Sequence, residues 1–513
     1  MLTKTKSYAL KGLEGYAVDI EVDITGGVPS LEMVGLPDAV VKESKDRVRS
    51  AIVNSEYEYP IKRLTINFAP AETRKEGSIF DLPIAIGILS ASEQTDYKAT
   101  QDYVFLGELS LDGSLRRISG LMAILISGVQ EGFKKFIIPY ENRNEACYVE
   151  GLEVYAARNL KEVVDHISGN NPIEPLEIVK FDADTTATTK YGIDFSEVKG
   201  QTTAKRALEI AVAGGHNVLM VGAPGAGKTM LAKCVLTIMP ELSFEEAVEV
   251  TKIHSVAGLL DATNGIVKTR PFRTPHHSVT LPALIGGDRK AKPGEVSLAH
   301  YGVLFLDEVP EYSRKALEAL RQPMEDGKVT VSRVMQTVDY PARFMLVGSM
   351  NPCPCGNFGS RNKECTCTPQ QIRNYIGKLS GPLLDRIDIQ VEVDSISYEE
   401  FAEEAPSEPS SAIRERVKRV REIERERFKD NAKGIHTNAE MSNADIQKFC
   451  KIDKESQALI EIAFVKLGLS ARASYRILRV ARTIADIEGC ENIQTEHIAE
   501  AIQYRSLDRK YWR

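Results

Sequence analysis

The chain lacks any long hydrophobic run along its 513 residues. Because a membrane-spanning helix needs about 18 or more consecutive apolar residues, we expect no transmembrane helix and no membrane partner. The first twenty residues, MLTKTKSYALKGLEGYAVDI, also lack the apolar core of a secretory signal peptide. These absences favour a cytoplasmic protein.

The chain also lacks an excess of positive charge, since its formal net charge is −7. This argues against a protein that binds nucleic acid with its whole surface. Local basic loops can still bind phosphates, because salt screens charges beyond about 10 Å at 0.1 M ionic strength. The length suggests about three domains.

Residues 222–229 read GAPGAGKT and match the phosphate-binding pattern G-x-x-x-x-G-K-[ST] in full. The apolar run Asn217–Val221 before them and the run Met230–Leu236 after them predict the strand, loop and helix that this motif requires, rather than a chance glycine-rich turn. Glycines let backbone N–H groups face an anion, and the helix N-terminus adds partial positive charge. We expect Lys228 to neutralise the β- and γ-phosphates of ATP and the Thr229 hydroxyl to bind Mg²⁺. The predicted nucleotide-binding residues are Gly222, Ala223, Pro224, Gly225, Ala226, Gly227, Lys228 and Thr229.

Two later strands are predicted to end in polar side chains beside this loop. Residues 302–308 read GVLFLDE, so an apolar strand ends at two carboxylates. Asp307 is a candidate nucleotide-site ligand of Mg²⁺, and Glu308 is a candidate activator of the attacking water. Residues 344–351 read FMLVGSMN and end at Asn351, a candidate sensor of the γ-phosphate or of that water. An acidic strand end and a turn asparagine before Pro352 are the structural alternatives.

Arg386 stands where a predicted helix gives way to a predicted strand, in SGPLLDRIDI (380–389). An arginine at such a corner can reach the γ-phosphate bound by a neighbouring subunit, where its planar fork suits the charge of the transition state. The alternative is an ion pair within the chain, with Asp385 or Asp388.

Four of the eight cysteines form a C-x-C…C-x-C cluster. Four thiolates match the ligand number of tetrahedral Zn²⁺, although the usual C-x₂-C spacing is missing. Iron–sulfur ligation and unliganded or redox-active thiols are the alternatives. The candidate metal ligands are Cys353, Cys355, Cys365 and Cys367.

An α/β module precedes the phosphate-binding region. Apolar runs such as Tyr16–Ile24 predict strands, and patterns such as Ala39–Val53 and Asp81–Ala91 predict helices. The module resembles the C-terminal domain of Lon proteases and its relative in the recombination protein RadA, on RKEGSIFDLPIAIGIL (74–89) and GELSLDGSLRRISGL (107–121).

The Lon resemblance implies a Ser–Lys catalytic pair, but the positions that would hold it fall near Ile79 and Met122. Ser78 is one residue away, yet a serine without a base is a weak nucleophile. We therefore expect a scaffold or DNA-contacting domain, with a cryptic hydrolase as the alternative.

The motifs in this order, with GSMNPCPCG (348–356) and SGPLLDRIDIQVEV (380–393), resemble the magnesium-chelatase-like AAA+ ATPases of the YifB/ComM family along essentially the whole chain. The resemblance implies that residues 222–229 are Walker A, that Asp307 and Glu308 are Walker B, that Asn351 is sensor 1 and that Arg386 is the arginine finger. It also implies a sensor-2 arginine that binds nucleotide, with Arg472 the first choice and Arg476 the second.

We thus expect an α/β protein with a Lon-like N-terminal domain at 1–168, a linker at 169–193, an AAA+ core with inserts at 194–400 and a C-terminal helical lid at 401–513. Within the core, residues 252–293 are long for a connection, and KVTVSRVMQTV (328–338) predicts a hairpin with Arg333 near its tip. In a ring, basic loops of this kind would follow a phosphate backbone, whereas the alternative is ordinary solvated loops.

The family resemblance implies a homo-oligomeric ring, a hexamer, that hydrolyses ATP with Mg²⁺ and moves DNA during recombination or natural transformation. Two other functions stay open: a chelatase motor subunit, and an ATP-dependent protein remodeller that acts through the Lon-like domain. Chelatase motor subunits usually lack the N-terminal module, which argues against the first of these. DNA-stimulated ATP hydrolysis would favour the DNA motor over both.

Overall fold

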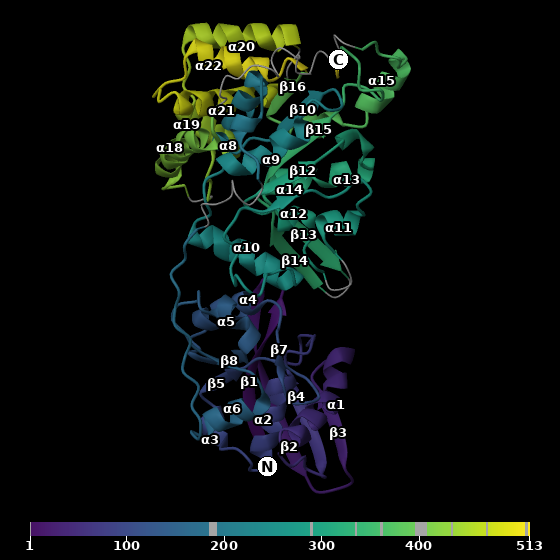
Figure 1. The fold of residues 1–513 in the computed structure, drawn as a ribbon, viewed down its shortest axis with the longest axis vertical. Helices are drawn as coiled ribbons and strands as arrows, with labels where there is room; N and C mark the ends of the chain where they lie inside the picture. The colour runs from purple at the N-terminus through teal and green to yellow at the C-terminus, as the bar shows by residue number, and fades with distance from the viewer. Residues whose placement is uncertain are drawn as a thin grey trace. The chain divides into compact units, whose positions relative to one another are not determined.

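The computed structural model describes residues 2–183, 192–287, 291–333, 336–359, 363–394, 408–431, 434–467, 470–507 and 511–512. The chain divides into two compact units, which are described one at a time. Unit 1 comprises Met1–Asp182 and Ser243–Lys268, and unit 2 comprises Ala183–Leu242 and Thr269–Arg513. In Figure 1 the purple elements near the N-terminus belong to unit 1, and the yellow elements near the C-terminus belong to unit 2.

Unit 1 is built on a seven-stranded sheet with the order β3–β4–β2–β1–β5–β8–β9. The pairs β1–β2 and β2–β4 are antiparallel, and the other neighbours are parallel. The strands are β1 (Leu2–Lys11), β2 (Glu14–Thr25), β3 (Ser30–Val34), β4 (Arg63–Ala69), β5 (Tyr103–Phe105), β8 (Lys135–Pro139) and β9 (Glu153–Ala157), with a small hairpin of β6 (Glu108–Leu109) and β7 (Leu115–Arg116). The helices are α1 (Ala39–Asn54), α2 (Asp81–Ala91), α3 (Tyr97–Thr100), α4 (Leu121–Gln130), α5 (Arg143–Ala146), α6 (Leu160–Ile167) and α10 (Phe244–Ala257).

Strand β1 lies inside the sheet, between β2 and β5, although its sequence does not show an apolar alternation. Its buried positions include Thr3, Thr5 and Ser7. Each of these hydroxyls donates to a backbone carbonyl of α2 or β5, at 2.9–3.0 Å. Hydrogen bonding therefore offsets the cost of burying polar groups where an apolar side chain would be expected.

Helix α10 belongs to unit 1, although its residues fall within the range 194–400 that was expected to form the ATPase core. The helix begins with a capping box of Ser243 and Glu246, and it packs against α4. At its other end, the Ser255 hydroxyl donates to the buried carboxylate of Glu145 at 2.6 Å and accepts from the N–H of Gly120 at 2.8 Å. These buried hydrogen bonds fix α10 in unit 1.

Residues at and near the positions where a Lon-type catalytic pair would fall are buried or hydrogen-bonded within unit 1. Met122 is fully buried in α4. The Ser78 hydroxyl donates to the carboxylate of Glu108. Lys75 is buried, and its ammonium group donates to backbone carbonyls, one of them that of Thr73 at 2.8 Å. Burial lowers the pKa of Lys75.

Unit 2 is built on a five-stranded parallel sheet with the order β11–β12–β15–β10–β16. The strands are β10 (Val218–Gly222), β11 (Phe272–Arg273), β12 (Val303–Leu306), β15 (Met345–Met350) and β16 (Ile389–Val393), with a separate antiparallel hairpin of β13 (Lys328–Arg333) and β14 (Gln336–Pro341). The helices of this part are α8 (Thr202–Gly214), α9 (Lys228–Ile238), α11 (Leu281–Ile285), α12 (Glu295–Leu298), α13 (Arg314–Ala319), α14 (Arg321–Asp326), α15 (Pro369–Ile376) and α16 (Gly381–Leu384).

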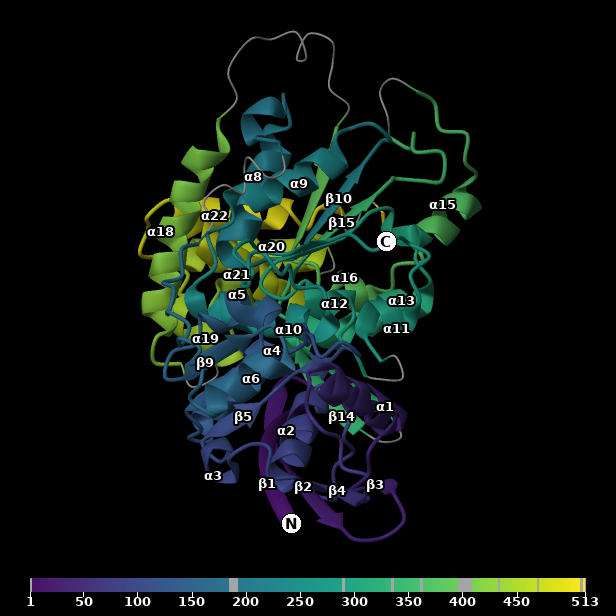
Figure 2. The ribbon, with the colours of Figure 1, turned by 60° about the horizontal axis from the view of Figure 1, so that its bottom comes forward.

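The C-terminal part of unit 2 is helical. Helices α18 and α21 pack against α8 (Figure 2). Their apolar side chains form one core with those of α9 and the central strands. The C-terminal helices are α18 (Ser410–Phe428), α19 (Asn443–Phe449), α20 (Lys454–Leu467), α21 (Ala471–Ile487) and α22 (Thr495–Gln503). The expected α/β class and the expected helices in the C-terminal part are confirmed.

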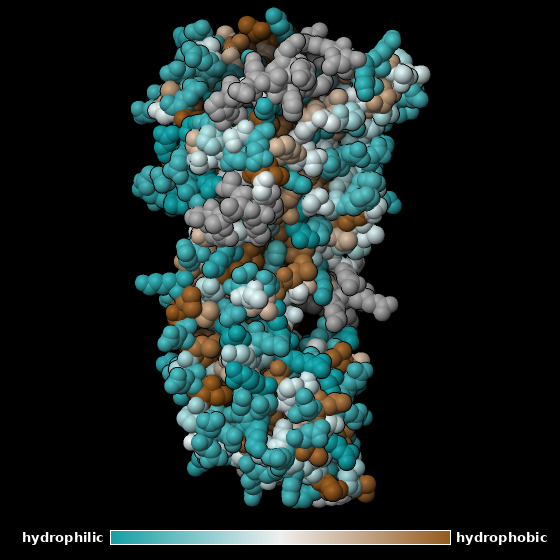
Figure 3. All heavy atoms as spheres, in the orientation of Figure 1, coloured by the Kyte–Doolittle hydropathy of each residue, from teal (hydrophilic) through white to brown (hydrophobic). Residues whose placement is uncertain are grey.

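Among the residues that the structure describes, no helix is long and apolar enough to cross a membrane. Hydrophilic side chains cover most of the face drawn in Figure 3, and apolar side chains appear on it in small separate groups.

Candidate nucleotide-binding site

Three neighbouring parallel strands of unit 2 end at the same edge of the sheet. Strand β10 pairs with β15, and β15 pairs with β12. The phosphate-loop motif follows β10, Asn351 follows β15, and Asp307 follows β12. Because the carboxyl ends of parallel strands meet at one edge, this topology brings the predicted residues together.

Lys228 is the first residue of α9, directly after Gly227, whose φ of 90° lies in the left-handed region that favours glycine. Its side chain is only 8% exposed. The ammonium group donates to the carbonyls of Gly222 and Ala223 at 2.7 and 2.9 Å, and to Oδ1 of Asn351 at 3.1 Å. Burial lowers the pKa of Lys228, and the charges of Asp307 and Glu308 oppose that shift. The ammonium group thus links the phosphate loop to the candidate sensor.

Thr229 and Asp307 face each other, with 3.2 Å between the Thr229 hydroxyl and Oδ2 of the carboxylate. The Thr229 side chain is exposed, so both oxygens can reach a bound ion. Two adjacent ligands of an octahedral Mg²⁺ at about 2.1 Å lie about 3 Å apart. The spacing therefore fits a shared Mg²⁺.

The other oxygen of Asp307 accepts from the Ser349 hydroxyl and from the backbone N–H of Glu308, the latter at 3.1 Å. Glu308 has a φ of 53°, an uncommon conformation for a residue with a side chain. Its side chain is exposed. The hydrogen bonds fix the backbone of this turn and leave the Glu308 carboxylate accessible to a water molecule.

Arg386 is held by contacts within unit 2 rather than at the phosphate loop. Its side chain is 10% exposed, and it donates to the carboxylate of Glu325 on α14 and to the carbonyl of Pro382 at 2.7 Å. Arg386 thus forms an ion pair within the chain, as in the alternative interpretation, but its partner is Glu325 rather than Asp385 or Asp388. The Glu325 side chain is 60% exposed, so the ion pair lies at the surface.

Arg472 and Arg476 lie in the first turns of α21 but have different surroundings. Arg472 is exposed, and its charge helps Arg386 to lower the pKa of Glu325. Arg476 donates to the buried carboxylate of Asp388. Although burial alone would raise the pKa of Asp388, Arg476 and His216 hold it well below its usual range. Arg476 is therefore engaged in a buried ion pair, whereas Arg472 is accessible.

Two residues of this region were not predicted from the sequence. Ser349 lies near the end of β15, two residues before Asn351, and side chains two residues apart in extended chain point the same way. That periodicity could have identified it. Glu325 has no comparable signal, because it lies far from Arg386 in the sequence and in an ordinary charged helix.

The predicted hairpin is present as β13 and β14. Val329, Val331 and Val338 are buried on one face, and Lys328 forms an ion pair with Asp339 at 2.8 Å on the other. Arg333 pairs with Gln336 at the end of the ladder, as expected for a position near the tip. The side chain of Arg333 lies outside the described part of the structure. Residues 288–290, which include Arg289 and Lys290, also lie outside it.

Family models described as subunits of magnesium chelatase match three segments of the chain. "Subunit ChlI of Mg-chelatase" matches residues 20–142, "Magnesium chelatase, subunit ChlI" matches residues 194–401, and "Magnesium chelatase, subunit ChlI C-terminal" matches residues 407–505. The matches include the N-terminal module as well as the nucleotide-binding region.

Curated relatives are similar along nearly the whole chain or along a part of it. "Competence protein ComM" of Haemophilus influenzae is 44% identical over 508 residues, which are 98% of this chain and 97% of the relative. "Uncharacterized protein YifB" of Escherichia coli is 43% identical over 503 residues, 98% and 96% of the two chains. "Lon protease 2" of Bacillus subtilis is 28% identical over 177 residues, 31% of this chain and 32% of the relative.

Proposed function

Because the chain belongs to the magnesium-chelatase-like YifB/ComM family, we propose that it is a ring-forming AAA+ ATPase that moves along DNA. Membership of this family implies the use of ATP and Mg²⁺. The observation that carries the proposal is the convergence of three strand ends, where Lys228 contacts Asn351 and Thr229 contacts Asp307.

In the proposed reaction, the N–H groups of the phosphate loop and Lys228 hold the β- and γ-phosphates of ATP. Thr229 and Asp307 would hold a Mg²⁺, which would supply positive charge to the phosphate oxygens. Asn351 positions a water molecule, whose oxygen bonds to the γ-phosphorus while the bond to the bridging oxygen breaks. Glu308 accepts the proton that the water loses, and ADP and phosphate leave.

We propose that the site is completed by Arg386 of a neighbouring copy in a hexameric ring. A guanidinium group at this position would neutralise charge that develops on the γ-phosphoryl group. In the single chain the Arg386 guanidinium pairs with the exposed carboxylate of Glu325. When the ring assembles, Arg386 would leave Glu325 and contact the phosphate oxygens of the ATP bound by the neighbouring copy. The accessible Arg472 is proposed to contact the nucleotide from α21.

DNA is proposed as the substrate of the motor because one close relative is a competence protein and because unit 2 carries a separate antiparallel hairpin beside its parallel sheet. A motor of this kind binds the phosphate backbone through basic side chains, independently of sequence. Because the net charge of the chain is −7, binding of the phosphate backbone would have to come from a local basic element.

Arg333→Ala is expected to keep the basal rate of ATP hydrolysis and to lose its stimulation by DNA. The measurement is the ATPase rate titrated with single-stranded and forked DNA at fixed salt. Lys429→Ala, at the end of α18, is the charge-matched control and should be stimulated like the wild type. A wild-type rate that DNA leaves unchanged contradicts the DNA motor, and full stimulation of Arg333→Ala contradicts the role of the hairpin.

A chelatase motor subunit is the second candidate, and the family models themselves favour it. Models described as chelatase subunits match residues 20–142, 194–401 and 407–505. The same DNA titration separates them, because a motor for porphyrin metallation has no reason to respond to DNA.

We also propose that the four clustered cysteines bind a structural Zn²⁺. All four belong to unit 2, which also contains the phosphate-loop motif.

A further inference from the structure

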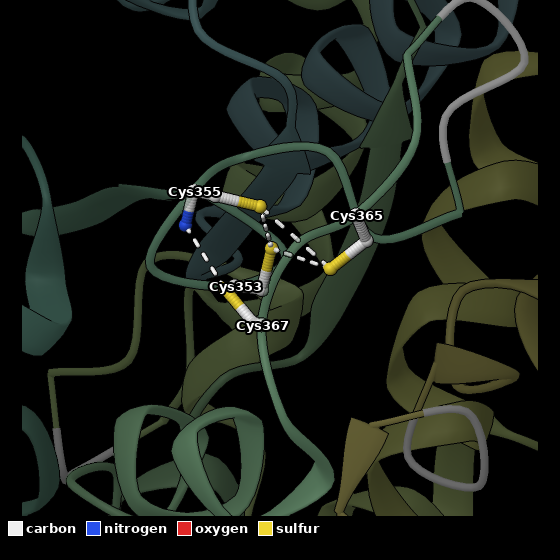
Figure 4. Close-up of side chains that lie close together, drawn as sticks. All are labelled: Cys353, Cys355, Cys365 and Cys367. Atoms are coloured by element: carbon white, nitrogen blue, oxygen red, sulfur yellow. Dashed lines mark hydrogen bonds between the residues drawn. The ribbon is translucent and has the colours of Figure 1, made fainter.

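Four cysteine sulfur atoms that were predicted from the sequence as a cluster converge in the structure (Figure 4). Cys353 and Cys355 follow the end of β15, and Cys365 and Cys367 precede α15. The sulfur of Cys353 lies 3.4 Å from that of Cys355 and 3.7 Å from that of Cys365. The four sulfur atoms all lie within 4.8 Å of one another, and all four cysteines are free thiols.

These distances suit one tetrahedral ion. With zinc–sulfur bonds of about 2.3 Å, the edges of a Zn(Cys)₄ tetrahedron are about 3.8 Å long. The sulfur of Cys355 lies 3.7 Å from that of Cys365, which is close to this edge. The ligand type, the ligand number and the distances between the sulfur atoms therefore all match a structural zinc site. The cysteines do so although they are separated by one residue in the sequence rather than by the usual two.

The backbone around the cluster supports the sulfur atoms as thiolates. The N–H of Phe358 points to the sulfur of Cys353 at 3.3 Å, and the N–H of Cys355 points to that of Cys367 at 3.4 Å. Donors of this kind around the ligands orient them and stabilise their negative charge. The loop is thus arranged for metal-bound sulfur.

A second group of metal-ligating side chains does not offer a comparable site. Glu488, Cys490 and His497 lie close together, but both ring nitrogens of His497 are in use. Nδ1 accepts from the N–H of Gln494 at 3.0 Å, so Nε2 carries the proton and donates to Glu488 at 3.0 Å.

The cysteine loop contacts the phosphate loop directly. Gly356, one residue after Cys355, has a φ of 80°, and a Cβ atom there would lie 2.4 Å from Cδ of Pro224. Pro224 is part of the predicted nucleotide-binding motif. Asn351, which accepts from Lys228, lies two residues before Cys353. The same short segment therefore touches the nucleotide site at two points.

We propose that Cys353, Cys355, Cys365 and Cys367 bind one Zn²⁺, and that the metal-held loop supports Pro224 and Asn351 so that ATP binding depends on zinc occupancy. The second part rests on the proposed ATPase function. Metal ligation would fix the backbone of the cysteine loop, and loss of the metal would release the contact that keeps the phosphate loop in place. Small displacements of this kind reduce kcat/KM by up to about a hundredfold.

The first test is the metal content of the full-length protein, purified under reducing conditions and measured by elemental mass spectrometry. We expect one zinc per chain in the wild type, and loss of zinc in the Cys355→Ser/Cys365→Ser double variant. Cys490→Ser, in the same unit, is the matched control and should keep its zinc. Protein without metal, or with iron in place of zinc, overturns the assignment.

The second test measures nucleotide affinity with a fluorescent ATP analogue while zinc is removed from the wild type by a chelator and then restored. We expect affinity to fall about tenfold or more on removal and to recover with Zn²⁺ but not with Mg²⁺ alone. Circular dichroism of the stripped protein monitors its folding. Unchanged affinity in stripped, folded protein overturns the coupling.

Gly356→Ala provides a variant in which all four thiols are intact. It is expected to keep one zinc per chain and to lose nucleotide affinity, because its methyl group would displace Pro224. Zinc-loaded Gly356→Ala with wild-type affinity overturns the coupling. A wild-type protein that binds zinc and ATP without responding to DNA would contradict only the DNA motor, so the two proposals fail separately.

Discussion

Glu308→Gln is expected to bind ATP about as tightly as the wild type and to hydrolyse it at least about a hundredfold more slowly. Glutamine has nearly the same shape as glutamate but cannot accept the proton of the attacking water. The backbone N–H of Glu308 is held by Asp307 at 3.1 Å, so the substitution should leave the turn in place. The measurements are kcat from phosphate release and the Kd of a fluorescent ATP analogue.

Glu311→Gln is the matched control, because Glu311 lies in the same turn and pairs with Lys378 at 3.6 Å. It should retain most of the wild-type rate. Hydrolysis by Glu308→Gln at half the wild-type rate or faster would contradict the role of Glu308 as the general base.

Arg386→Ala is expected to reduce kcat about a thousandfold while nucleotide affinity changes only a few-fold, because an arginine finger acts mainly on the transition state. Because Arg386→Ala also breaks the ion pair with Glu325, a control must separate the loss of that pair from the loss of the arginine finger. The pair is exposed on the Glu325 side, so breaking it should cost little stability. Steady-state kinetics and thermal unfolding of the variant measure the two effects separately.

Glu325→Gln breaks the same ion pair and keeps Arg386. We expect it to hydrolyse ATP at a rate close to that of the wild type. If Glu325→Gln loses as much activity as Arg386→Ala, the pair itself is needed for the structure of the site, and the finger assignment is wrong.

Much of the nucleotide site could be predicted from the sequence because each part of it follows a local pattern. The phosphate-loop motif and the carboxylates of Asp307 and Glu308 stand directly after apolar strands, so the strands place them without any information about distant packing. The parallel order of β10, β15 and β12 then brings Lys228, Asp307 and Asn351 together.

Other features depend on contacts between residues distant in sequence. Strand β1 buries hydroxyl groups whose partners lie in α2 and β5, so its hydropathy does not alternate. Helix α10 reads as part of the nucleotide-binding core, but the buried hydrogen bond between Ser255 and Glu145 fixes it in unit 1. The partner of Arg386 could not be predicted either, because the nearby Asp385 and Asp388 were the obvious candidates.

The most direct test of a nucleotide site shared between two copies is subunit mixing. Lys228→Ala and Arg386→Ala should each be inactive alone, the first for lack of phosphate binding and the second for lack of the neighbour's arginine. In a mixed ring of equal amounts, about a quarter of the seams join an intact phosphate loop to an intact Arg386. We predict recovery of about a quarter of the wild-type ATPase rate. Mixed rings that are shown by native mass spectrometry to assemble and that stay inactive would contradict the shared site.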